Sequence, residues 1–326
     1  MRARLGRILA WAVTAAALGW LFWKTPIGEV WAAVERASPW TIPAVLASVL
    51  LIYAADSFAM WKTFGWFLAK LPFRDVLIVR GATYLLAAIN YSVGQGAIVY
   101  FVHRARGVPV MRGVATVLLI MGTNVLVLLS MVTAGLFLGS ERPTGLVPVV
   151  AIAWSALAVY IVVVAVRPRW LAKRPLFDVL LSAGLLGHLK PMLVRLPHIA
   201  ALIAFNLSAL WGFGVDVPLG TAVAAIPVVL FIAVLPISVQ GLGTTQAAMI
   251  LFFARFVPPA VGDSHAVVLG ASLSAQAVAL SVQVVTGIVC LRTKTARGLG
   301  DVAKRGLQQP GGAAVAPAGV PPATLG

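Results

Sequence analysis

One acidic residue, Asp56, stands inside a long apolar stretch of the chain, LLIYAADSFAMW at 50–61. If this stretch crosses a membrane, Asp56 lies in the cytoplasmic third of the bilayer, where a carboxylate costs less than the ~2.5–3.5 kcal/mol that it costs at the centre. Acids retained at such a cost usually handle protons, ions or substrate, or they pair with a nearby cation. Arg80 and Arg104 are the candidate partners. The sequence therefore predicts either proton or ion coupling at Asp56 or a structural ion pair.

Two other stretches place glycines and polar side chains inside apolar sequence: AAINYSVGQGAIVYFVHRARGVP at 87–109 and AVLPISVQGLGTTQAAMILFFARFVP at 233–258. A helix that begins inside a membrane presents unpaired N–H groups and a positive dipole, which attract an anion. Gln95 and Gln246 occupy near-equivalent positions in the two stretches. They could donate to a phosphate or a sugar hydroxyl, or they could satisfy the interrupted backbone.

The candidate substrate-binding residues follow from these two stretches. Arg104 lies near the end of the first stretch and Arg255 near the end of the second. Each could hold a lipid phosphate or simply extend to the membrane surface. The whole set is Asn90, Ser92, Gly94, Gln95, Gly96, Arg104, Pro236, Ser238, Gln240, Gly241, Gly243, Thr245, Gln246 and Arg255.

The composition identifies the class of protein that must position these residues. Of 326 residues, 61% are hydrophobic and only 10% are charged, with a mean hydropathy of +0.99. This is the composition of an all-α polytopic membrane protein. The net charge of +16 does not indicate nucleic-acid binding, because the basic residues lie in short loops between apolar runs. The sequence contains no zinc, dinucleotide, Walker or nucleophile motif, so we expect no enzyme activity, metal or cofactor.

The apolar runs and the loop charges together predict the topology. Runs at roughly 8–23, 37–61, 113–140, 143–166, 196–215 and 264–291 read as six crossings, the first of them short. If 81–102 turns back within the membrane near Asn90–Gly96, most of the 25 basic residues fall on one side. That side is then the cytoplasm, with both termini in it. The longer run 217–254 is expected to turn at Pro236–Gly243 and to enter from the opposite face.

The order of span, hairpin and span occurs twice, which predicts an inverted-topology repeat with a site at the membrane midplane. We expect one membrane domain over 1–306. It contains repeat one at about 37–140, repeat two at about 196–291 and a basic, half-apolar cytoplasmic segment at 167–195 that lies on the membrane surface. The Pro/Gly/Ala-rich tail, 307–326, is expected to be disordered.

The stretches 89–119 and 235–259 resemble the flippase-like membrane family that includes the transmembrane region of lysylphosphatidylglycerol synthases. The match is most specific in LPISVQGLG, at Pro236, Ser238, Gly241, Leu242 and Gly243. The family commonly has acids near the positions of Gln95 and Gln246, and an acid–arginine pair where this chain has Gly122-Thr-Asn124.

The resemblance implies a protein of the bacterial inner membrane that moves or binds a lipid or lipid-linked headgroup. An anionic phospholipid or polyprenyl-linked glycan headgroup would be handled between the two hairpin tips. The alternative is an accessory subunit that positions a separate glycosyltransferase or lipid-modifying enzyme through 167–195.

Overall fold

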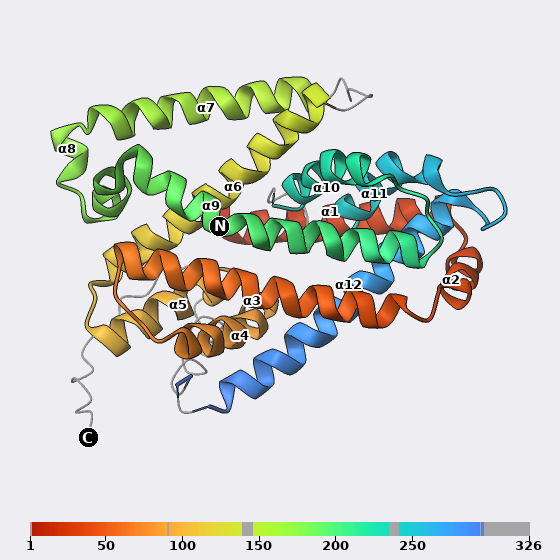
Figure 1. Cartoon of the computed structure of the whole chain (residues 1–326), viewed down its shortest axis with the longest axis horizontal. Helices are drawn as coiled ribbons and strands as arrows, with labels where there is room; N and C mark the ends of the chain where they lie inside the picture. The colour runs from red at the N-terminus through yellow and green to blue at the C-terminus, as the bar shows by residue number, and fades with distance from the viewer. Residues whose placement is uncertain (1, 90, 139–145, 235–240, 294, 297–326) are drawn as a thin grey trace. The chain divides into compact units, whose positions relative to one another are not determined.

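The computed structural model describes residues 2–89, 91–138, 146–234, 241–293 and 295–296 (Figure 1). These residues form helices and the turns between them. The helices are α1 (Arg2–Lys24), α2 (Ile27–Arg36), α3 (Thr41–Phe67), α4 (Phe73–Ile89), α5 (Tyr91–Arg106), α6 (Val110–Leu138), α7 (Leu146–Val166), α8 (Arg169–Ala172), α9 (Pro175–Gly212), α10 (Leu219–Val234), α11 (Thr244–Phe253), the short 3₁₀ helix η2 (Ala254–Phe256) and α12 (Ser264–Leu291). The expected all-α membrane class is confirmed.

Five helices, α3, α6, α7, α9 and α12, are long and apolar enough to cross a membrane. They coincide with five of the six predicted crossings. The sixth predicted crossing, 8–23, forms α1 but is not among these five helices. A total of six crossings therefore stays a prediction.

Two helices extend beyond the predicted crossings. Helix α3 continues to Phe67 and α4 begins at Phe73, so most of the predicted loop 62–80 is helical. Helix α9 starts at Pro175 and runs to Gly212 with one kink at Gly184, which has φ 62°. Residues 185–195 of the predicted surface segment therefore continue directly into the predicted crossing at 196–215.

The chain divides into two compact units, and the second comprises residues 56–123, 159–194 and 283–326. Its core lies around α4 and α5, which pack side by side as a helical hairpin. The core includes Phe64 of α3, Val79 and Leu86 of α4, and Ile98 and Val102 of α5.

The first unit comprises residues 1–55, 124–158 and 195–282. It contains the second helix pair, α10 and α11, which also pack against each other. Helix α11 contacts α1, and Leu21 of α1 packs with Val30 of α2 and with Ala266 and Leu269 of α12.

A similar order of helices occurs twice in the described residues. A long helix, two short helices and another long helix occur first as α3, α4, α5 and α6, and again as α9, α10, α11 and α12. At about 1.5 Å per residue, the 17 residues of α4 and the 16 of α5 reach about 25 Å, less than the roughly 30 Å hydrocarbon layer. That both pairs turn back within the membrane, from opposite faces, remains a prediction.

Candidate functional site

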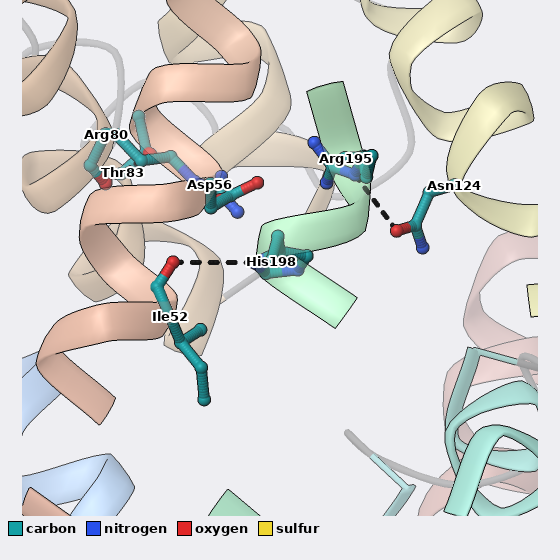
Figure 2. A network of polar contacts seen from close by, with 7 residues as sticks. All are labelled: Ile52, Asp56, Arg80, Thr83, Asn124, Arg195 and His198. Carbon is teal, nitrogen blue, oxygen red and sulfur yellow. Dashed lines mark hydrogen bonds and ion pairs between the residues drawn. The ribbon is translucent and has the colours of Figure 1, made fainter. Parts of the chain in front are cut away.

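The clearest polar feature of the second unit is an ion pair between α3 and α4. The Arg80 Nε–H donates to Asp56 Oδ2 at 2.5 Å, and Figure 2 shows the two side chains pointing toward one another. Asp56 is 1% exposed, whereas the Arg80 side chain is 18% exposed. Arg80, one of the two cations predicted as partners for Asp56, therefore fills this role.

Tyr84, on the same helix, packs against the Arg80 guanidinium, and Thr83 bonds the Arg80 backbone. The guanidinium carbon lies 4.8 Å from the ring centroid of Tyr84, one helical turn further along, in a cation–π contact. The Thr83 hydroxyl donates to the Arg80 carbonyl at 2.8 Å. Since Arg80 is the more exposed member of the ion pair, an anion that reaches this site would meet the guanidinium before the acid.

Most of the first predicted turn, Asn90–Gly96, is helical. Residues 91–96 form the first turns of α5, so Gly94, Gln95 and Gly96 belong to a helix and not to an open loop. A Cβ atom added at Gly94 would lie 2.8 Å from the Cβ of Ala87 on α4. The glycine at this position allows α4 and α5 to approach closely, whereas the prediction assigned it to chain reversal.

Part of the second predicted turn, Pro236–Gly243, lies among the described residues and directly precedes α11. Gly241 and Gly243 have φ values of 75° and 83°, a region that only glycine enters at little cost. The Gly243 N–H donates to Oε1 of Gln246 at 2.7 Å, in the arrangement of a helix N-terminal cap. Gln246 is 2% exposed, so its carbonyl satisfies the broken backbone, which was the second of its two predicted roles.

The remaining predicted site residues differ in exposure. Arg104 and Arg255 are exposed, and the Arg255 guanidinium stacks on the ring of Phe256 at 4.6 Å. Gln95 is half-buried on α5. In the part of the chain that the structure describes, the buried Thr245 hydroxyl has no hydrogen-bond partner. The predicted residues Asn90, Pro236, Ser238 and Gln240, and the Ser92 side chain, lie outside what the structure describes.

The first unit also contains buried polar contacts that the sequence prediction missed. Arg195 of α9, counted above with a cytoplasmic basic segment, is 8% exposed and its Nε–H donates to Asn124 Oδ1 at 3.0 Å. His198 lies three residues further along α9, and its Nδ1–H donates to the Ile52 carbonyl at 3.4 Å (Figure 2). The spacing of three residues, which places both side chains on one helix face, is the signal that could have identified this pair.

A third polar contact lies in the second unit. The Tyr160 hydroxyl of α7 donates to His188 Nε2 at 2.5 Å, and His188 Nδ1–H donates to the Gly184 carbonyl at 2.7 Å. This contact ties α7 to the kink of α9. Within the described ranges, no three His, Cys, Asp or Glu side chains gather closely enough to bind a metal ion.

Long apolar helices with a buried ion pair and a helical hairpin define a multi-pass α-helical membrane protein. The family model described as the lysylphosphatidylglycerol synthase TM region matches residues 7–287. The chain therefore belongs to that family, as its two glycine-containing stretches indicated. Comparison with curated proteins gives no match.

Proposed function

We propose that this protein binds the anionic headgroup of a membrane lipid or lipid-linked glycan and moves it between the two leaflets. The observation that carries the proposal is the ion pair of Asp56 and Arg80. Asp56 lies on α3, which is long enough to cross a membrane, and Arg80 lies on α4, whose 17 residues are shorter than the hydrocarbon layer. The membrane family of the chain supports the same area of function.

The unequal burial of the pair suggests how a headgroup would bind. A guanidinium holds a phosphate through two parallel hydrogen bonds, and the partly exposed Arg80 presents that group. A phosphate would compete with the buried Asp56 carboxylate for the Arg80 guanidinium. Headgroup binding would then be coupled to Asp56, the residue predicted to handle protons, ions or substrate.

The helix pairs would supply the rest of the path. The first residues of α5 carry N–H groups that lack partners within the helix, and their positive dipole favours an anion. Because Gln246 caps α11, the side-chain role in headgroup binding falls to Gln95. If the turn between α4 and α5 lies at half the depth of the membrane, Gln95 and the first N–H groups of α5 contact the headgroup there. This is the depth at which a charged headgroup is most costly to place in hydrocarbon.

The test is transport by the purified protein alone in vesicles of phosphatidylcholine with a trace of fluorescent phosphatidylglycerol. A membrane-impermeant quencher removes the fluorescence of lipid in the outer leaflet only. The rate of the further loss of fluorescence therefore measures how fast lipid moves from the inner to the outer leaflet. We expect faster movement than in protein-free vesicles, and slower movement for Gln95→Leu. Rates equal to those of protein-free vesicles would refute transport by this chain.

An exposed apolar surface favours a second candidate function, that of an accessory subunit. Trp170 of α8 is 72% exposed and Leu186 of α9 is 66% exposed, within the predicted segment 167–195. These side chains could dock a glycosyltransferase or lipid-modifying enzyme. This function predicts no transport by the purified chain, and a co-purifying enzyme that is lost in the double variant Trp170→Ser with Leu186→Ser.

A further inference from the structure

Helix α2 is short, and the ends of three candidate membrane spans hold it in place within the first unit. Four residues separate its last residue, Arg36, from the start of α3 at Thr41. In that connection the Ser38 N–H donates to the carbonyl of Gly212, the last residue of α9, at 2.8 Å. The Arg36 Nη1–H donates to the Val261 carbonyl at 3.2 Å, three residues before α12 begins.

These contacts fix the depth of α2. Thr41 begins one candidate span, Gly212 ends another, and Ser264 begins a third. A Cβ atom added at Gly212 would overlap the Thr41 side chain, so the ends of α3 and α9 touch. The ends of three candidate spans meet here, which points to this level as the boundary between hydrocarbon and water. Helix α2 lies beside it.

The sequence of α2 divides its surface into three faces. Val30 and Ala33 are buried, and both lie against Gly270 of α12. Ile27 and Trp31, which are 73% and 64% exposed, are four residues apart and share a second face. On a wheel of about 100° per residue, Glu29 lies about 160° from Trp31.

Glu29 and Arg36 therefore lie on the side opposite Ile27 and Trp31, whereas Glu35 lies one turn after Trp31 at the end of the exposed apolar face. A helix that only faced water would gain nothing from exposing Ile27 and Trp31. A helix lying in the plane of a membrane surface places one flank in the acyl boundary and the other in water. The Trp31 Nε1–H donates to Glu35 Oε1 at 2.7 Å, which satisfies the indole donor while its rings enter the boundary layer.

We infer that α2 is an interfacial helix whose Ile27–Trp31 face is inserted into the lipid headgroup and upper acyl region of one leaflet. Nothing in the proposed lipid transport requires this surface, so the inference stands independently of that function. Through Leu21 and Val30, which share a core cluster with α12, α2 also ties the C-terminal end of α1 to this depth. A Cβ atom added at Gly243 would lie 2.6 Å from the Ala17 methyl of α1. Because α1 contacts α11 this closely, α2 would set the depth of the start of α11 as well.

The test uses full-length protein in phosphatidylcholine vesicles, with single cysteines placed in turn at Ile27, Trp31, Glu29 and Arg36 and then spin-labelled. All four positions are exposed, so the labels stay out of the core, and the label at 29 serves as the water-side reference because the one at 36 also removes the Arg36–Val261 hydrogen bond. The native Cys290 is buried, and protein without an added cysteine, carried through the same labelling, measures its background. Collision rates with oxygen, which concentrates in lipid, are compared with those of a nickel chelate confined to water.

The expected result is a split between the two flanks. Labels at 27 and 31 should collide more with oxygen than with nickel, and labels at 29 and 36 should show the reverse. Nickel access at all four positions would show a helix in water and would overturn the inference. Loss of access to both reagents at 27 and 31 would show a protein partner or a second copy over this face, and would overturn it equally.

Discussion

The ion pair of Asp56 and Arg80 makes the most quantitative prediction. Breaking a buried ion pair by removing one partner typically costs about 3–5 kcal/mol. Asp56→Asn leaves an Arg80 side chain that is 18% exposed and partly hydrated, so we expect a loss near about 3 kcal/mol. Arg80→Gln leaves a carboxylate that is 1% exposed, so we expect a larger loss, about 4 kcal/mol.

The double variant separates the pair from its surroundings. Once one partner is gone, removing the other adds little, so the double variant should also lose about 4 kcal/mol. The two single losses then exceed the double loss by about 3 kcal/mol, which is the coupling between the side chains. The assay is unfolding of the purified protein by dodecyl sulfate in mixed micelles, followed by circular dichroism.

The control is Glu35→Gln, which changes an exposed acid and should alter stability by no more than about 0.5 kcal/mol. Losses of Asp56→Asn and Arg80→Gln that simply add in the double variant would show that the two side chains are not coupled. The ion pair would then contribute nothing to stability, whatever the size of each separate loss.

Three further predictions concern single contacts, each read by the same unfolding assay. Gln246→Leu removes the acceptor of the Gly243 N–H and should cost about 1–2 kcal/mol, while a neutral effect would deny the capping role. Gly135→Ala should cost about 1–3 kcal/mol, because its Cβ would lie 2.7 Å from a backbone oxygen of α10; unchanged stability would refute that close packing. Tyr160→Phe leaves the buried His188 Nε2 without its donor and should cost about 1–3 kcal/mol, and a stabilised variant would contradict the contact.

Much of the helix framework could be predicted from sequence, because a continuous apolar run is the direct signature of contact with lipid. Five predicted crossings correspond to helices, and at most of the helix ends the predicted and observed bounds differ by only a few residues. The long start of α9 was the exception. Its basic residues suggested a surface segment, yet Arg195 is buried and pairs with Asn124.

The details of the candidate site were harder to predict, because they depend on which helix lies beside which. Gly94 looked like a turn residue, but its contact with Ala87 shows that the glycine permits two helices to touch. Both roles of Gln246 were open until its distance to Gly243 decided for the backbone. Asp56 was recognisable from its apolar neighbours alone, whereas the choice of Arg80 over Arg104 required the packing of α4 on α3.

The most direct test of the central claim compares lipid movement by two arginine variants in the same vesicles. Arg80→Gln removes the cation proposed to hold the headgroup, and Arg112→Gln removes an exposed arginine at the start of α6. The account predicts that movement of fluorescent phosphatidylglycerol falls at least about tenfold for Arg80→Gln, equivalent to about 1.4 kcal/mol, and is unchanged for Arg112→Gln. Equal rates for the two folded variants would contradict it.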